Sequence, residues 1–129
     1  IRAASLLTHF GGRHEVQELG RLLRIEHQSA VRAQLISVLG RIGTSAASAE
    51  YIRRTVTAEV AGNCDGRVGN AAIMAIRQLR PYLHGSDWYI AEEVLQKIME
   101  NPFPPQVRHA AAFAKRPPAP GFLPLNRLE

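Results

Sequence analysis

The chain has 129 residues, of which 46% are hydrophobic and 21% are charged, and this ordinary composition for one globular domain excludes collagen-like and disordered classes. Its single cysteine, Cys64, excludes an internal disulfide framework and any zinc or iron–sulfur site built from several cysteines. The formal net charge is +5 and most basic residues are arginine, whose planar guanidinium suits carboxylate and phosphate groups, so an acidic protein or a nucleic acid is a permitted partner but not a required one.

Glycine, proline and small polar residues divide the chain into segments of helical length. Strand signals are nearly absent, because β-branched residues dominate no window. The sequence therefore predicts an all-α fold with about seven helices, at residues 1–10, 14–25, 29–42, 46–61, 67–80, 87–100 and 105–115. Residues 117–129 are rich in proline, and we expect them to form an extended tail.

The helical period is clearest in the segments 29–42 and 67–80. Their apolar residues share the offsets 0, 4, 7, 8 and 11, which place them on one stripe of a helix. The two stripes are Val31, Leu35, Val38, Leu39 and Ile42, and Val68, Ala72, Ala75, Ile76 and Leu79. Val107, Ala111 and Ala114 begin the same pattern in the last segment, so the sequence predicts an internal repeat.

The segments between these helices are also amphipathic. Their stripes are Val16, Leu19 and Leu23, then Ala49, Ile52, Val56 and Val60, then Trp88, Ala91, Leu95 and Ile98. Each helix pair has too little surface to bury its apolar face alone and must stack on its neighbours. We therefore predict one domain over residues 1–116, an α-α superhelix with three helix pairs at 13–43, 46–80 and 87–116 behind a leading helix at 1–10.

The second helix of each pair resembles that of the HEAT-repeat family, in particular its short HEAT-like repeats. In that family this helix opens with Val-Arg and alanines and ends in Leu-Gly. The matching runs here are Val31-Arg32-Ala33 with Leu39-Gly40, and Val107-Arg108-His109-Ala110-Ala111, whereas Val68-Gly69 lacks the arginine. The resemblance implies a HEAT-like solenoid whose second helices line the concave surface, and it implies that Arg32 and Arg108 bridge neighbouring turns.

Three arginines near the ends of second helices are the candidate partner-binding residues. Arg41, Arg77 and Arg80 lie off the apolar stripes, so we expect them on one face and pointing to solvent. The competing interpretation of each is a solvated helix end, where a cation gains a few tenths of a kcal/mol from the macrodipole.

No pattern predicts a catalytic, metal or cofactor site. The five histidines are dispersed, with no pair at i, i+4 beside an acidic residue. The run from Gly62 to Gly69 lacks the Lys-Ser/Thr of a P-loop and is expected to be a turn, with glycines at positive φ and Asp65 as N-cap. Ser86-Asp87-Trp88-Tyr89 has the Asp and aromatics that HEAT-like DNA glycosylases use, but the favoured interpretation is a helix cap with Trp88 as a buried anchor.

The first functional hypothesis is a non-catalytic interaction or scaffold module, with no small-molecule ligand, that binds a protein or neighbouring domains of its parent chain on the second-helix ridge. The second is a nucleic-acid-binding arm of a larger enzyme, such as a HEAT-tailed polymerase or reverse transcriptase. A HEAT-like DNA glycosylase ranks below both. Because the chain begins at Ile1 without methionine, we expect a fragment of a larger protein. With no apolar run of membrane-spanning length and no visible secretory leader, we expect no membrane partner and a cytoplasmic location.

Overall fold

The computed structural model describes residues 13–42 and 46–115, which are 87% helical, contain no strand and form six α-helices packed against each other. The helices are α2 (Arg13–Ile25), α3 (Ser29–Ile42), α4 (Ala46–Ala61), α5 (Gly66–Leu79), α6 (Trp88–Glu100) and α7 (Pro105–Lys115). Two 3-10 turns, η1 (Arg80–Tyr82) and η2 (Gly85–Asp87), join α5 to α6. The all-α prediction is confirmed, and all six helices agree with their predicted ranges to within one residue at each end. The predicted helix 1–10 and the tail 117–129 lie outside the described residues.

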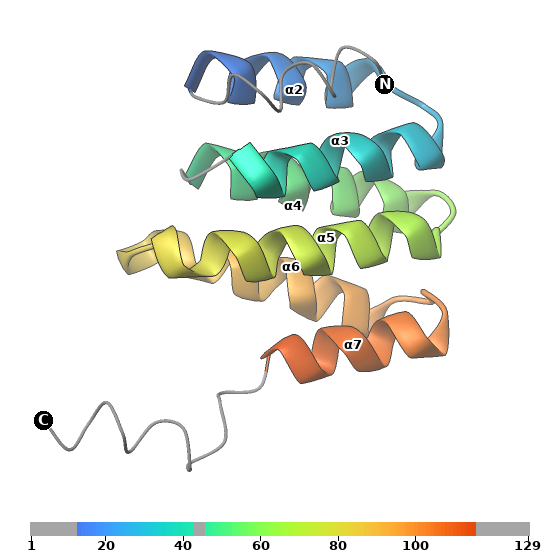
Figure 1. Cartoon of the computed structure of the whole chain (residues 1–129). Coiled ribbons are helices and arrows are strands. Elements are labelled where there is room, and N and C mark those ends of the chain that lie inside the picture. The colour runs from blue at the N-terminus through green and yellow to red at the C-terminus, as the bar shows by residue number, and fades with distance from the viewer. Residues whose placement is uncertain (1–12, 43–45, 116–129) are drawn as a thin grey trace, which may run out of the picture.

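The helices form two layers (Figure 1). The first layer contains α2, α4 and α6, in which α2 packs on α4 and α4 on α6. The second layer contains α3, α5 and α7, which lie side by side in the same order. Each helix also packs against its chain neighbour in the other layer. This alternation joins the three predicted helix pairs into one packed unit.

The core lies between the layers and is made from the predicted apolar stripes. Leu39 of α3 and Ile76 of α5 are completely buried, as are Ile52 of α4 and Leu95 of α6. The ends of the stripes are only partly buried, because Val31, Ile42 and Val60 lie at the edge of the core. The helical period thus predicts correctly which face of each helix points inward.

Phe103 is a core residue that the periodicity does not identify. It lies in the turn between α6 and α7, outside any helix, and is 1% exposed. A Cβ atom added at Gly69 would lie 2.8 Å from Val107 and 3.0 Å from the Phe103 ring. Gly69 therefore stands in α5 where α3 and α7 carry Arg32 and Arg108, because α7 and its preceding turn leave no room for a side chain.

The predicted anchor role of Trp88 is wrong. Its side chain is 39% exposed, and the buried stripe of α6 consists of Ala91, Val94, Leu95 and Ile98. Asp87 holds the N-cap position, but its side chain makes no capping hydrogen bond. Both differences have the same physical reason, which is that η2 runs directly into α6. The first turn of α6 therefore needs no side-chain cap, and Trp88 lies at the end of the core.

The turn between α4 and α5 confirms one prediction and corrects another. Asp65 caps α5, with its carboxylate accepting a hydrogen bond from the amide of Arg67 at 2.8 Å. The positive φ in this turn belongs to Cys64 (φ 48°), not to a glycine as predicted. The Cys64 amide donates to the carbonyl oxygen of Glu59 at 2.9 Å and closes the C-terminus of α4, a position where a left-handed residue commonly ends a helix.

Candidate partner-binding surface

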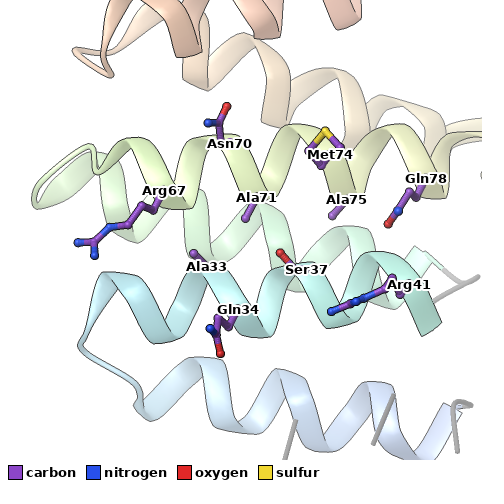
Figure 2. Close-up of a pocket in the computed structure, with 10 residues that line it drawn as sticks. All are labelled: Ala33, Gln34, Ser37, Arg41, Arg67, Asn70, Ala71, Met74, Ala75 and Gln78. Atoms are coloured by element: carbon purple, nitrogen blue, oxygen red, sulfur yellow. The ribbon is translucent and has the colours of Figure 1, made fainter. Parts of the chain in front are cut away.

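A groove runs along the seam between α3 and α5 on the exposed side of the second layer (Figure 2). We call it the α3–α5 groove. It has a volume of about 680 Å³ and is lined by Ala33, Gln34, Ser37, Arg41, Arg67, Asn70, Ala71, Met74, Ala75 and Gln78. None of these lining residues is acidic or aromatic.

Small residues create this groove. A Cβ atom at Gly40 would lie 2.6 Å from the Cα atom of Ala75, so the backbones of α3 and α5 approach closely. Beside this contact the seam is lined by Ala33, Ser37 and Ala71, whose side chains are too short to fill the space above it. Close backbones and short side chains together leave a hollow that larger residues would close.

The walls of the α3–α5 groove are polar. Gln34 comes from α3, and Asn70 and Gln78 come from α5. Each of their amide groups has two donors and an acceptor, so each can bind either polar group of a peptide backbone. Met74, which is 57% exposed, adds an apolar surface to the same wall.

The two arginines of the groove lie at its opposite ends, Arg67 at one and Arg41 at the other (Figure 2). Arg67 is exposed and forms an ion pair with Asp65 at 2.9 Å, which lowers the pKa of the Asp65 carboxyl. Arg41 is exposed and has no ion-pair partner among the described residues. One end of the groove therefore carries a guanidinium that no carboxylate of the described chain neutralises.

Charge is distributed unequally between the layers. Within the described residues, α3, α5 and α7 contain no acidic residue, whereas each carries two basic ones: Arg32 and Arg41, Arg67 and Arg77, Arg108 and Lys115. The helices of the first layer contain all the acidic residues that lie in a described α-helix, namely Glu15, Glu18, Glu50, Glu59, Glu92, Glu93 and Glu100. The described helices of the second layer therefore carry only positive charge, and the carboxylates that pair with Arg32 and Arg67 come from α4 and from the turn before α5.

The predicted trio of arginines is only partly brought together. Arg41 and Arg77 are both exposed, in the last turns of neighbouring helices of the second layer. Arg41 lines the α3–α5 groove, whereas Arg77 lies outside its lining. Like Arg41, Arg77 has no ion-pair partner among the residues that the structure describes.

The expectation that Arg80 points freely to solvent is wrong. Its side chain is only 20% exposed, and its Nη2 donates to a Glu92 carboxylate oxygen at 2.6 Å. Its Nη1 donates to the carbonyl oxygen of Ala114, and its guanidinium carbon lies 4.6 Å from the centroid of the Trp88 ring. α5 ends at Leu79, and the 3-10 turn that follows directs Arg80 to α6 and α7. Arg80 therefore fastens three helices together.

Arg32 and Arg108 each bond to the turn that precedes their own helix, and the bridging of neighbouring turns stays a prediction. Arg32 donates from Nη2 to the carbonyl oxygen of His27 at 3.0 Å, and Arg108 donates from Nε to that of Phe103 at 2.9 Å. In both cases the acceptor is five residues earlier, in the turn before the helix. These two arginines are thus structural, and neither is a candidate for partner binding.

Glu59 is a polar residue that the sequence analysis missed. It is 1% exposed, and its carboxylate accepts hydrogen bonds from the Ser29 hydroxyl at 3.2 Å and from the Asp65 amide at 3.0 Å. It also forms an ion pair with Arg32 at 3.3 Å. Glu59 thereby joins the start of α3 to the end of α4. Its position three residues after Val56, on the apolar stripe of α4, was the signal that could have identified it.

A smaller pocket of about 210 Å³ lies between α2 and α4. Its lining includes Arg24, Arg32 and Arg54. Arg32 is held by Glu59, and Arg54 donates to Glu50 at 2.8 Å. Two of its three guanidinium groups already have carboxylate partners, so this pocket offers less positive charge to a ligand than the α3–α5 groove does.

Among the described residues, no cluster of three His, Cys, Asp or Glu side chains has a geometry able to hold a metal ion. Burial raises the pKa of the Cys64 thiol, and the nearby Glu59 charge adds to this rise, so the reactive thiolate is disfavoured. Within residues 13–42 and 46–115, the helices lack the length and apolar character needed to cross a bilayer.

Comparisons of the chain with protein-family profiles, with curated proteins and with solved structures found no match. The resemblance to HEAT repeats therefore stays a prediction from the residues quoted above.

Proposed function

We propose that the chain is a non-catalytic interaction module with a HEAT-like solenoid architecture, and that it binds an acidic protein partner on its second layer. The observation that carries this proposal is the charge distribution. The described helices of the second layer hold six basic residues and no acidic one, while those of the first layer mix both signs. A surface of one sign attracts a partner of the other sign and steers its approach.

The packing order supports the architecture in this proposal. First helices pack on first helices and second helices on second helices, which is the arrangement that stacked helix pairs produce. In a HEAT-like solenoid the second helices line the concave side, so the basic layer would face inward. The partner is then a separate protein or a neighbouring domain of a longer parent chain, and a cytoplasmic location remains an expectation from the sequence.

Nucleic acid is the second candidate partner, because the same acid-free layer would also attract phosphates. Four of its six basic residues already make hydrogen bonds or ion pairs within the chain: Arg32, Arg67, Arg108 and Lys115. Only Arg41 and Arg77 have none among the described residues. With the Nη1 of Arg67 added, which is unpaired within the described part of the chain, the layer offers about three phosphate contacts and a slope of log affinity against log salt of about −3, which is shallow for a nucleic-acid-binding protein. This low number favours the protein partner.

The experiment compares three arginines in matched positions. Arg24, Arg41 and Arg77 each lie in the last turn of a helix and are exposed, but Arg24 belongs to the first layer. We expect Arg41→Glu and Arg77→Glu to weaken binding to poly-L-glutamate at low salt, measured by fluorescence anisotropy, and Arg24→Glu to leave it unchanged. All three carry the same charge change and the same macrodipole penalty.

Two outcomes would overturn the proposal. The first is equal weakening by all three variants, since binding would then follow net charge rather than the second layer. The second is no binding to poly-L-glutamate at any salt concentration. Tighter binding to an oligonucleotide than to poly-L-glutamate, with a steep salt slope, would favour the nucleic-acid candidate instead.

A further inference from the structure

We propose that the α3–α5 groove binds an extended peptide segment that carries two acidic side chains about five residues apart. This inference rests on the proposed function, because it names the partner of the same second-layer surface. It is carried by three features of the groove, which are its length, the chemistry of its walls and the placement of its two arginines.

The length of the groove sets the spacing. Its lining on α5 runs from Arg67 to Gln78, a distance of about 16 Å at a rise of roughly 1.5 Å per helical residue. An extended chain rises about 3.3 Å per residue and covers that distance in about five residues. Arg67 of α5 and Arg41 of α3 lie at opposite ends and on opposite walls of the groove (Figure 2). Side chains five residues apart in an extended segment point to opposite sides, so one such carboxylate would face the Arg67 wall and the other the Arg41 wall.

The walls favour an extended segment over a helix. A helix pairs its backbone N–H and C=O groups internally, whereas an extended segment presents one donor and one acceptor per residue. The Gln78 amide, which points across the seam in Figure 2, supplies both kinds of partner, and the amides of Gln34 and Asn70 lie at the outer edges of the groove. The floor of Ala33, Ala71 and Ala75 is low enough for a backbone to approach, and Met74 offers a flexible apolar contact to a side chain between the two acids.

Both arginines have donors for an incoming carboxylate. Arg41 has no ion-pair partner among the described residues. Arg67 uses its Nε and Nη2 on Asp65, which leaves Nη1 without a partner in the described part of the chain. A guanidinium has five N–H donors, so Arg67 can hold Asp65 and a peptide carboxylate together.

The same features disfavour nucleic acid in this groove. Single-stranded nucleic acid is bound by aromatic side chains on which bases stack, and none of the ten lining residues is aromatic. Duplex binding relies on many phosphate contacts, and the groove contains two cations. A peptide needs only two carboxylate contacts, because its backbone bonds to the amides supply the rest.

The experiment titrates the full chain with labelled ten-residue peptides of serine, threonine and valine. One carries glutamate at its third and eighth positions, a second has the same composition with the two glutamates adjacent, and a third has lysine in their place. We expect the first to bind at least ten-fold more tightly than the second and the third not to bind. Equal binding of the first two peptides would overturn the predicted spacing.

Two variants fill the groove without changing its charge. Ser37→Phe fills the seam, and Asn70→Phe fills the wall at an exposed position, so one can replace the other if it unfolds on circular dichroism. We expect each folded variant to lose at least ten-fold in affinity for the first peptide, as Arg41→Glu does, while the matched control Arg24→Glu keeps wild-type affinity.

Further outcomes separate failure of this inference from failure of the proposed function. Unchanged peptide binding in both groove-filling variants, together with weaker poly-L-glutamate binding in Arg41→Glu, would overturn the groove and leave the second layer as the binding surface. If the wild-type protein binds neither the first peptide nor poly-L-glutamate, both proposals are overturned. Tighter binding of oligo-dT than of the first peptide would identify nucleic acid as the occupant and also overturn this inference.

Discussion

The two layers bury the same kind of apolar stripe, but the first layer mixes acidic and basic residues whereas the described helices of the second carry basic residues only. In the first layer, acidic residues lie one helical turn from arginine or lysine: Glu18 with Arg21, Glu50 with Arg53 and Arg54, Glu93 with Lys97. Such i,i+3 and i,i+4 pairs neutralise the surface of each helix locally. The described helices of the second layer contain no acidic residue, so Arg32 and Arg67 find carboxylates outside the layer, and Arg41 and Arg77 are left for a partner or for solvent. Helices with the same burial pattern therefore carry different surface charge in the two layers.

The layers also differ in how closely their helices approach. In the second layer, Gly40 of α3 sits against the backbone of Ala75 in α5. In the first layer, Gly20 of α2 sits against the ring of Tyr51 in α4, with ring atoms 2.4 to 2.5 Å from where a Cβ would be. A backbone contact gives the second layer the tight seam that opens into the α3–α5 groove, whereas in the first layer the Tyr51 ring lies between the helices and leaves only the smaller pocket between α2 and α4.

The largest expected change in the free energy of unfolding comes from substitutions in the core, which the two layers share. Leu39→Ala and Ile76→Ala each remove a completely buried side chain, and we expect each to lower the free energy of unfolding by about 2–5 kcal/mol in urea titrations. Met74→Ala, at a position 57% exposed, is the control and should change it by less than about 0.5 kcal/mol. Changes below that size at both core positions would mean that the stripes do not face inward.

The second prediction separates a structural arginine from a free one. Arg80→Ala removes a guanidinium that contacts α6, α7 and Trp88, and leaves Glu92, 21% exposed, without its partner. We expect a loss of about 1.5–3 kcal/mol in the free energy of unfolding, because hydrogen bonds to charged groups contribute in that range. Arg77→Ala, three residues earlier on the exposed face, should cost less than about 0.5 kcal/mol. Equal losses in the free energy of unfolding would contradict the structural role of Arg80.

Arg80 also marks the limit of what the sequence could predict. The six helices followed from local signals, since apolar period and Gly or Pro breaks act over a few residues. The partners of Arg80 are Glu92 and Ala114, which lie 12 and 34 residues away along the chain. Only the packing of α5 against α6 and α7 brings them together.

The exposed arginines of the candidate site could be predicted from the sequence, whereas the α3–α5 groove could not. Arg41 and Arg77 were correctly expected to be exposed, since both lie off the apolar stripes, but the same reasoning failed for Arg80. The α3–α5 groove was not predicted, because Ala33 and Ala71 look like ordinary helix formers until α3 and α5 are known to be neighbours. Glu59 was missed for a related reason, since its partner Ser29 is 30 residues away.

The third prediction compares the seams of the two layers. Gly40→Ala forces the backbones of α3 and α5 apart, and overpacking of this kind costs about 1–3 kcal/mol. Alanine recovers about 1 kcal/mol of helix propensity, so we expect a net loss of up to about 2 kcal/mol by thermal unfolding. Gly20→Ala should cost less, because the Tyr51 ring can rotate away from the new methyl group while the Ala75 Cα cannot. A larger loss at Gly20 than at Gly40 would contradict the difference in packing.

The smallest expected effect concerns pH and belongs to the first layer. Hydrogen bonds from Arg53, and then from Arg54, lower the pKa of the Glu50 carboxyl below its ordinary value. A carboxyl whose pKa is lower in the folded state than in the unfolded chain stabilises the fold above its unfolded pKa of about 4.3, and this contribution is lost as the pH falls through the lower, folded value. Because the group is partly exposed, we expect the contribution to be below about 1 kcal/mol.

Glu50→Gln is the variant that isolates this contribution. Its stability, measured by urea titration, should lie below that of the wild type at pH 7, and the gap should close as the pH falls below about 4. Asp65 has a pKa lowered by Arg67 and will add its own acid dependence to both proteins, so the test uses the difference between them. The described helices of the second layer have no carboxylate that could give such a dependence. A gap that stays constant down to pH 3 would mean that Glu50 stabilises α4 by something other than its charge, and the contrast between the layers would lose its electrostatic basis at this position.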